Sequence, residues 1–334
     1  MNEHRRALVK ALAAAGVAGL GAPFAIAAPP PETSRIRLVK FPSICQAPVY
    51  IAEELLRAEG FTDISYVDGA PFAAGPKTYE ILSDGAVDIA VQFAAPLAMA
   101  IDRGLNITVI GGIHPGCFEL FTGPEVRSVK DLKGKTVCVF GNESPQHTFL
   151  ASIATSVGLD PGRDINWVFH PPVQGKQMLA EGKISGYLGF PPDPQELRDR
   201  KIGRMLLSST IDKPWSQYFC CMAAANRDWA RKHPVATKRA LRALLKASEL
   251  CAADPDTAAR AYIATGYKVN PEYARQALRE LTFTRWRELN AEETLRFYSL
   301  RLREAGMVKS APQKIIEQGT DWRFMNELKR EMKA

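Results

Sequence analysis

Strand-like and helix-like segments alternate in this 334-residue chain from residue 35 to residue 223. Apolar runs such as residues 87–92 and 136–140 are typical of buried strands. Segments with helical periodicity lie between such runs, and Gly60 and Gly85 end the first two of them. Strand–helix units repeated in this way predict an α/β protein with mostly parallel sheets covered by helices.

The same patterns place the individual segments. We expect strands at residues 35–41, 64–67, 87–92, 107–111, 118–121, 136–140, 167–170, 184–189, 205–208 and 218–223. We expect helices at residues 49–58, 79–83, 96–102, 145–157 and 174–181, and an almost wholly helical chain from residue 227 onward. Such a pattern fits two α/β lobes between which the chain crosses twice.

The lobes can be assigned to stretches of the chain. Residues 35–124 are expected to form the first part of lobe 1, and residues 125–215 to form lobe 2. Residues 216–334 then return to lobe 1 and end in C-terminal helices. The crossings are expected near residues 122–126 and 213–217, where glycine and proline favour a hinge.

Residues 1–27 carry the pattern of an export signal. Arg5, Arg6 and Lys10 precede a short apolar run, and small residues around Ala27 offer a cleavage site. The run is too short to cross a bilayer, and no cysteine follows it to support a lipid anchor. We expect export to the periplasm with cleavage near Ala27, by the general secretory or the twin-arginine route.

The net charge argues against nucleic acid as a partner. The chain carries a formal charge of +7, and removal of the signal, with three basic residues and one acidic residue, lowers it to +5. The remaining Lys and Arg are scattered over the expected helices, whereas nucleic acid binding favours a basic stripe or a recognised module. No later segment is long and apolar enough to span a membrane.

The six cysteines show no metal-binding spacing. There is no C-x-x-C pair and no zinc pattern, so no metal and no cofactor is expected. One disulfide is possible in an exported protein, but the sequence does not assign it. Cys138, Cys220 and Cys221 are expected to be buried free thiols on strands.

Ligands of open α/β sheets bind beyond the carboxyl ends of the strands. The corresponding loops are rich in Gly, Pro, amides and aromatic residues and have few acids, which suits small-molecule binding better than acid–base catalysis. These loops are residues 42–46, 68–72, 92–95, 112–116, 141–144 and 189–193.

One of these loops leads into a well-marked helix start. After the strand at 136–140, Ser144 can cap a helix and Pro145 can occupy its first position. Free backbone N–H groups and the positive end of the helix dipole then favour a carboxylate, sulfonate or phosphate. An ordinary strand–loop–helix connection is the alternative.

Candidate catalytic groups are few. His114 and His147 lack partners nearby in the sequence, which favours ligand contact or a loop position over catalysis. The chain has no phosphate-binding loop and no G-x-S-x-G elbow. Trp215 and Tyr218, beside the second crossing, can close over a ligand or pack the hinge.

Five segments in order resemble motifs of one protein family. They are Gln46-Ala-Pro-Val-Tyr-Ile-Ala-Glu53, Leu82-Ser-Asp-Gly-Ala-Val-Asp-Ile-Ala90, Ser128-Val-Lys-Asp-Leu-Lys-Gly-Lys135, Leu179-Ala-Glu-Gly-Lys-Ile-Ser-Gly186 and Ala225-Asn-Arg-Asp-Trp-Ala-Arg-Lys-His-Pro234. In the fourth, Ser185 stands where the family has Asp. The family comprises the substrate-binding proteins of nitrate, sulfonate, taurine and thiamine-precursor ABC importers.

The resemblance implies the type II periplasmic binding protein fold, with a ligand held between two lobes that close by hinge motion. It implies a non-catalytic, monomeric receptor for a small polar or anionic, or aromatic, organic solute, which works with an inner-membrane ABC permease. The candidate ligand-binding residues are Ser43, Gln46, Gln92, Phe93, His114, Asn142, Ser144, Gln146, Phe190 and Tyr218. Phe72 and Trp215, together with the aromatic residues among these candidates, are expected to pack against an apolar part of the ligand.

Two alternatives stay open. The same superfamily contains an iron-dependent synthase of the thiamine pyrimidine, whose C-C-C-F-C run falls near residues 218–222. Only Cys220 and Cys221 are present here, and neighbouring residues of a strand face opposite ways, which argues against that enzyme. The other alternative is a ligand-sensing partner of a membrane signalling protein.

Overall fold

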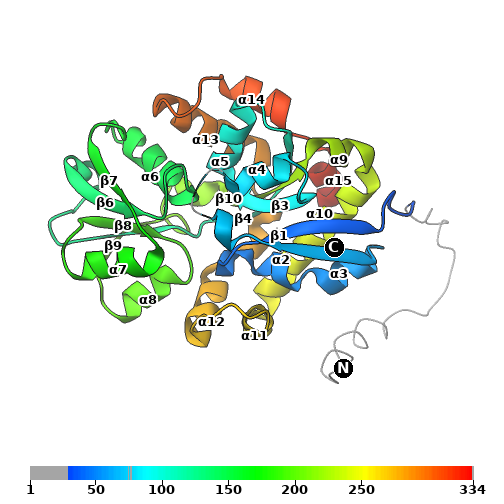
Figure 1. The fold of residues 1–334 in the computed structure, drawn as a ribbon, viewed down its shortest axis with the longest axis horizontal. Coiled ribbons are helices and arrows are strands. Elements are labelled where there is room, and N and C mark those ends of the chain that lie inside the picture. Colours follow the sequence, from blue (N-terminus) through cyan, green and yellow to red (C-terminus); the bar gives the residue numbers. More distant parts are fainter. Residues whose placement is uncertain (1–28, 74, 76, 333–334) are drawn as a thin grey trace. The chain divides into compact units, whose positions relative to one another are not determined.

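Two five-stranded sheets frame the protein, whose computed structural model describes residues 29–73, 75 and 77–332 (Figure 1). The expected export signal lies outside the described residues. The first sheet has the order β2 (Asp63–Asp68), β1 (Arg35–Lys40), β3 (Ile89–Phe93), β10 (Phe219–Asn226), β4 (Ile107–Pro115). The second has the order β7 (Ile165–Phe169), β6 (Lys135–Val139), β8 (Gly186–Gly189), β5 (Glu119–Thr122), β9 (Arg204–Ser208).

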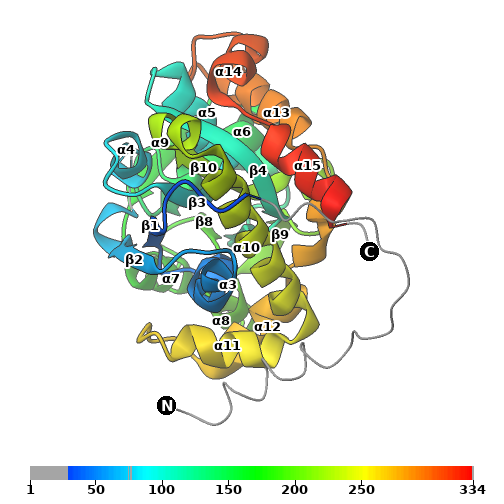
Figure 2. The ribbon, with the colours of Figure 1, turned by 90° about the vertical axis from the view of Figure 1, so that its right-hand side faces the viewer.

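Helices cover both sheets, and we call each sheet with its helices a lobe. The first lobe contains η1 (Ile44–Gln46), α2 (Ala47–Ile51), α3 (Glu53–Ala58), η2 (Ala70–Phe72), α4 (Lys77–Ser83), α5 (Ala94–Asp102), α9 (Arg227–Lys232), α10 (Pro234–Ala253), α11 (Pro255–Ile263), α12 (Pro271–Glu280), η5 (Phe283–Arg287), α13 (Ala291–Glu304), α14 (Pro312–Gly319) and α15 (Arg323–Glu331). The second contains η3 (Val129–Leu132), α6 (Pro145–Ser156), α7 (Pro172–Ala180) and α8 (Asp193–Asp199), and η4 (Trp215–Gln217) lies between β9 and β10. In Figure 2 the long helix α10 runs across the first sheet. Within the described part of the chain, no helix is both long and apolar enough to cross a membrane.

Strand β10 is the last strand along the described chain and lies inside the first sheet. It pairs antiparallel with β3 on one side and with β4 on the other, while β1 pairs parallel with β2 and β3. All residues of β3, β4 and β10 are buried, as expected for strands covered on both faces. Gly112 allows a close approach, because a Cβ there would lie 2.4 Å from the ring of Phe219 in β10.

The predicted fold class is confirmed, with differences in detail. The expected strand near residues 118–121 is β5, and it belongs to the second sheet, so the chain first crosses between β4 and β5 rather than near residues 122–126. The expected helix at 49–58 is divided into α2 and α3. Helix α8 was not predicted, because Pro191, Pro192 and Pro194 mark the segment as a loop.

The start of α6 shows why this lobe packs as it does. Ser144 caps the helix through a hydrogen bond from the N–H of His147, and Pro145 is its first residue, as predicted. The His147 ring packs edge-on against Trp167 at 4.6 Å, and its Nδ1 accepts a hydrogen bond from the N–H of Glu143 at 3.0 Å. Burial lowers the pKa of His147 from 6.5 to about 4, so the imidazole is neutral at pH 7.

A pH titration of stability tests this burial. Because the folded-state pKa of His147 lies below its ordinary value, the unfolded chain binds the proton more readily, and the free energy of unfolding falls as the pH drops from 6.5 towards 4. The difference between the two pKa values corresponds to about 3 kcal/mol. Between pH 6.5 and pH 4, we expect the free energy of unfolding of His147→Gln to fall by about 2–3 kcal/mol less than that of the wild type. Urea denaturation at each pH measures this difference.

His170→Gln is the matched control, because His170 follows β7 in the same lobe and is only partly buried. It removes a histidine from the same lobe, and the effect of His147→Gln is measured against it. An equal pH dependence in the wild type and His147→Gln would contradict the account.

Candidate functional site

Three side chains that can bind a metal ion or a proton lie close together at the edge of the first sheet where β1, β3 and β4 end. Cys45 lies in η1 after β1, His114 lies near the end of β4, and Cys221 lies near the start of β10. All three are buried, and the sulfur atoms and an imidazole nitrogen lie within 4.8 Å of one another. Because β10 is antiparallel, its first residues lie beside the last residues of β3 and β4.

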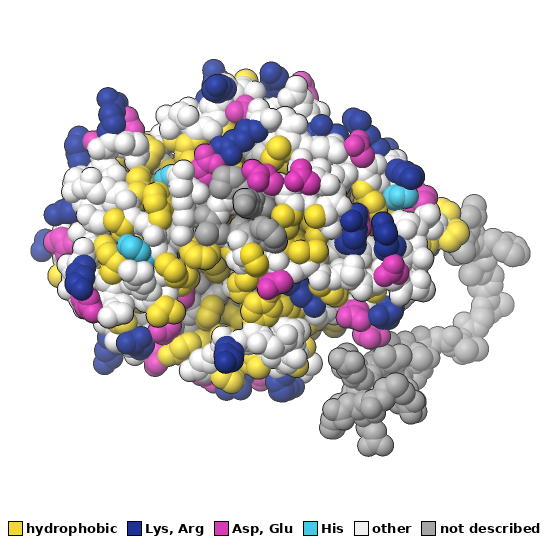
Figure 3. All heavy atoms as spheres, in the orientation of Figure 1, with side chains coloured by type: hydrophobic (Ala, Val, Ile, Leu, Met, Phe, Trp, Pro, Cys, Tyr) yellow, Lys and Arg dark blue, Asp and Glu magenta, His cyan; other side chains and the backbone are white. Residues whose placement is uncertain are grey.

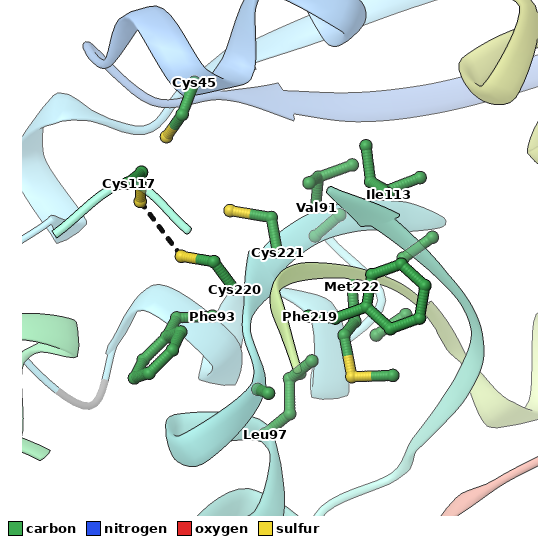
Figure 4. Packing of buried hydrophobic residues seen from close by; sticks show 14 of the residues in the cluster. Cys45, Val91, Phe93, Leu97, Ile113, Cys117, Phe219, Cys220, Cys221 and Met222 are labelled. Atoms are coloured by element: carbon green, nitrogen blue, oxygen red, sulfur yellow. Dashed lines mark hydrogen bonds between the residues drawn. The ribbon is translucent and has the colours of Figure 1, made fainter. Parts of the chain in front are cut away.

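Two further thiols lie in the same place. The sulfur atoms of Cys117 and Cys220 are 2.9 Å apart. Figure 4 shows the sulfur atoms of these two residues and of Cys45 and Cys221 directed toward a common space. We call Cys45, His114, Cys117, Cys220 and Cys221 the thiol cluster.

A bulge in β10 brings adjacent cysteines together. The register between β10 and β4 shifts on both sides of Cys221, and Cys220 has no opposite residue in β4. A bulge rotates one residue out of the strict alternation of a strand. The expectation that Cys220 and Cys221 face opposite ways was therefore wrong, since both thiols contact the cluster.

The His114 ring is held in place by its neighbours. Its Nδ1 lies 3.0 Å from the carbonyl oxygen of Pro115 and donates to it, which fixes the position of that proton. The ring lies edge-on to Phe283 at 5.2 Å. The other nitrogen, Nε2, is buried and has no hydrogen-bond partner among the described residues.

The environment separates the thiols by acidity. Hydrogen bonds from Cys117, Cys220 and Cys45, together with the charge of His114, hold the pKa of Cys221 well below its usual value. Burial lowers the pKa of His114, but the neighbouring sulfurs outweigh this effect and raise it well above the usual value. Burial raises the pKa of Cys117 and Cys220. Cys221 is therefore the most acidic thiol of the cluster, and a thiol of lowered pKa is the kind that binds a metal or acts as a nucleophile.

Two of the predicted ligand residues border the cluster, and a third belongs to it. The hydroxyl of Ser43 is 3.0 Å from the sulfur of Cys45 and donates to the carbonyl oxygen of Pro191 in the second lobe at 3.3 Å. The Nε2 of Gln46 donates to the carbonyl oxygen of Val91 at 3.2 Å. It also lies 3.9 Å from the sulfur of Cys221 in the cluster. His114 is itself a member.

Two others lie in β3 and are part of the core. Gln92 and Phe93 are both buried. The Phe93 ring packs edge-on against Phe118 at 4.9 Å and Phe149 at 5.6 Å. Phe149 belongs to α6, so this aromatic group joins the two lobes.

The second lobe holds four more predicted residues. Asn142 is exposed before α6, Ser144 is buried with its hydroxyl occupied by the cap, and Gln146 is buried. The Oε1 of Gln146 has no hydrogen-bond partner among the described residues. Phe190 is partly buried, with its ring edge-on to Phe118 at 6.2 Å.

Tyr218 and Trp215 pack the second crossing. The Tyr218 ring stacks on Phe297 of α13 at 4.0 Å, and the Trp215 ring lies edge-on to the same phenylalanine at 5.3 Å. Of the two interpretations left open by the sequence, this geometry favours hinge packing. For Phe72, also predicted to contact a ligand, the side chain lies outside what the structure describes.

The lobes touch through polar contacts at several points. The N–H of Ile44 donates to the carbonyl oxygen of Pro191 at 3.3 Å. Arg103 of α5 pairs with Glu143 before α6 at 2.6 Å, and Arg198 of α8 pairs with Glu280 of α12 at 2.6 Å. On the face seen in Figure 3, hydrophobic side chains gather where the lobes meet.

Two surface hollows elsewhere lack this chemistry. One of about 540 Å³ is bounded by residues 263–270, and one of about 310 Å³ lies beside residues 123–125 and 201–203. Neither is lined by a cysteine, a histidine or a predicted ligand residue. The interface between the lobes remains the better candidate site.

The four clustered cysteines were missed by sequence reasoning. All six cysteines are buried and free, in agreement with the expectation of buried thiols for Cys138, Cys220 and Cys221. Cys45 and Cys117 lie at or beside predicted strand-end loops, which was a usable signal. The spacing of residues in the sequence does not reveal that β10 inserts beside these loops, nor that it contains a bulge.

The chain is related in sequence to part of one curated protein. It is 24% identical over 247 residues to the bicarbonate transport ATP-binding protein CmpC of Synechocystis sp., a match that covers 67% of this chain and 36% of that protein. The chain therefore spans about a third of the length of this curated relative.

Two solved structures share the fold. The periplasmic nitrate-binding protein NrtA from Synechocystis PCC 6803 aligns with a TM-score of 0.74 and 15% identity, covering 91% of this chain and 90% of that one. The alkanesulfonate-binding protein SsuA from Xanthomonas axonopodis pv. citri, bound to MOPS, aligns with a TM-score of 0.67 and 18% identity, covering 84% and 96%. At these identities the likeness establishes the periplasmic binding protein fold.

A family profile gives the assignment. The profile of the NMT1-like family matches residues 29–266, which include β1 to β10 and reach the end of α11. The match covers well over half of the chain, and the resemblance identified from the sequence motifs is confirmed. This protein belongs to the NMT1-like family.

Proposed function

We propose that this protein is an exported, non-catalytic receptor that binds a small polar or anionic organic solute, aromatic solutes included, between its two lobes. It would deliver the solute, as a monomer, to an inner-membrane ABC permease. The fold supports this proposal, because periplasmic binding proteins of this kind close two lobes around a ligand by hinge motion. The nitrate and alkanesulfonate bound by the structurally similar proteins support an anionic solute.

Buried polar atoms without partners carry the proposal. The Oε1 of Gln46 in the first lobe and the Oε1 of Gln146 in the second are both buried, and neither has a hydrogen-bond partner among the described residues. Leaving such an atom unpaired costs about 1–3 kcal/mol. Both residues were predicted from the sequence to bind a ligand, and a solute would supply the missing hydrogen bonds.

The Gln46 amide also limits which chemical groups the solute can present to it. Its Nε2 is occupied by the carbonyl oxygen of Val91, so its remaining atom is an acceptor. An acceptor requires an N–H or O–H donor on the solute. The start of α6 offers the opposite polarity, since its N–H groups and dipole favour a negative group. We therefore infer a solute with an anionic end and a donor group.

A second candidate function has one observation in its favour. The thiol cluster places Cys221, a thiol of lowered pKa, beside the interface, and the facing argument against a synthase-like enzyme does not hold in this structure. Turnover of a bound compound would identify an enzyme. Binding without turnover agrees with the receptor.

A stability screen tests solute binding. We expect one class among nitrate, sulfonates, carboxylates, aromatic acids and thiamine or flavin precursors to stabilise the purified protein. A hundredfold excess over the dissociation constant adds about 2.7 kcal/mol, which raises the midpoint of thermal unfolding by about 5 °C. No shift with any class at millimolar concentration would contradict the choice of solute.

Replacement of Gln146 tests the carrying observation. Gln146→Met removes a buried unpaired oxygen at nearly constant volume, so we expect unchanged or slightly higher stability. We expect affinity for the solute found in the screen to fall at least about tenfold, since one hydrogen bond is worth about 1.4 kcal/mol or more in a dry site. Calorimetric titration and urea denaturation measure the two effects.

Ser299→Ala is the control for Gln146→Met. The hydroxyl of Ser299 is also buried without a partner among the described residues, but it lies in α13 and was not predicted to bind a ligand. Affinity should remain that of the wild type in this variant. Equal affinities in Gln146→Met and the wild type would remove Gln146 from the site.

A charge placed before α6 tests the anionic end of the solute. Asn142 is exposed and precedes the helix start, so Asn142→Glu adds a competing negative charge without disturbing the core. We expect affinity to fall about three- to tenfold at low salt and the loss to shrink at high salt. Asn166→Glu, at an exposed position of β7 in the same lobe, is the matched control. Equal effects of the two substitutions would contradict a role of the helix start.

A further inference from the structure

We propose that Cys45, His114 and Cys221 form a binding site for a thiophilic d¹⁰ cation, Zn²⁺ or Cu⁺, with Cys117 or Cys220 as the fourth ligand. Thiolate and imidazole are the ligands that such cations prefer. The proposal goes beyond solute binding and does not depend on it. It rests on the positions of the side chains.

The spacing suits a tetrahedral site. Metal–sulfur bonds of about 2.3 Å and metal–nitrogen bonds of about 2.0 Å place neighbouring ligand atoms about 3.5–3.8 Å apart. The sulfur atoms of Cys45 and Cys221 and a nitrogen of His114 already lie within 4.8 Å of one another. The remaining difference of about 1 Å from the spacing around a bound metal is left to side-chain rotation.

His114 is oriented as a metal ligand. Its Nδ1 donates to the carbonyl oxygen of Pro115 at 3.0 Å. Its Nε2 is buried with no hydrogen-bond partner among the described residues. Metal-binding histidines typically have one nitrogen fixed by a backbone carbonyl and bind the metal through the other.

Neighbouring donors are placed to support thiolates. The Nε2 of Gln46 has a second N–H besides the one donated to Val91, and it lies 3.9 Å from the sulfur of Cys221. The hydroxyl of Ser43, 3.0 Å from the sulfur of Cys45, would turn from the carbonyl oxygen of Pro191 to donate to a thiolate there. Such contacts stabilise negative sulfur and orient the ligands around the metal.

The fourth ligand comes from the bulge region. Cys117 and Cys220 lie 2.9 Å apart, and both contact Cys221. The group of ligand atoms within 4.8 Å of one another includes neither sulfur, so one of these two side chains would turn toward the metal to complete a Cys₃His set, which is a common structural zinc site. Cys138 and Cys251 show the contrast, since each is a buried cysteine outside the cluster.

Metal titration of the full-length protein, reduced and freed of metal, tests the site. We use Co²⁺ as the optical probe, then Zn²⁺ and Cu⁺ as competitors. We expect one equivalent of Co²⁺ to give thiolate-to-metal charge-transfer absorption and the visible bands of tetrahedral coordination, and Zn²⁺ or Cu⁺ to displace it. Absence of these bands, or octahedral bands alone, would overturn the proposal.

Single substitutions identify the ligands. Cys45→Ser, Cys221→Ser and His114→Gln should each weaken Zn²⁺ binding by about 100-fold or more. Cys138→Ser and Cys251→Ser should retain wild-type binding and the wild-type spectrum. Retention of tight binding by the Cys45→Ser/Cys221→Ser double variant would overturn the proposal.

A further test uses the wild type alone, so that it remains valid even if the substituted variants fail to fold. We expect one equivalent of Zn²⁺ to protect the cluster thiols from a thiol reagent added during mild denaturation by a larger factor than Cys138 and Cys251, which the metal protects only by stabilising the fold as a whole. Peptide mapping by mass spectrometry identifies the protected residues. Equal reactivity of Cys45 and Cys221 with and without Zn²⁺ would overturn the proposal. It would also be overturned if the reduced protein bound no metal and Cys117 and Cys220 only formed a disulfide on oxidation.

Discussion

The insertion of β10 between β3 and β4 is the constraint on which the site depends. The strand enters the first sheet from the second lobe and runs antiparallel to both neighbours, so its first residues lie at the carboxyl ends of theirs. Cys220 and Cys221 lie more than a hundred residues along the chain from Cys45 and His114. The pairing of β10 with β3 and β4 is what brings them together. The bulge at Cys220 and the close approach at Gly112 then set the direction of the side chains.

The same interface contains polar groups that the protein does not satisfy by itself. An apolar core would be more stable at Gln46, His114 and Gln146, since each buries an atom with no partner among the described residues. Groups of this kind are expected where a ligand completes the hydrogen bonds. They belong to both lobes, and polar contacts such as Arg103–Glu143 hold those lobes together.

Much of the fold could be predicted from sequence, because it follows from local patterns. Apolar runs, glycine stops and the Ser144-Pro145 start placed most strands and helices and the cap of α6. Helix α8 was missed because its prolines favour a loop, and β5 was assigned to the wrong lobe because strand pairing between distant segments leaves no local mark. The thiol cluster was missed for the same reason: its ligands come from η1, β4, the first crossing and β10, and the facing of Cys220 depends on a bulge.

Hydrogen–deuterium exchange with and without the solute identified by the stability screen is the most direct test of binding between the lobes. The account predicts slower exchange of backbone amides in η1 of the first lobe and at the start of α6 in the second, with α10 and α11 unchanged. Slower exchange confined to one lobe, or centred on the hollow at residues 263–270, would contradict it.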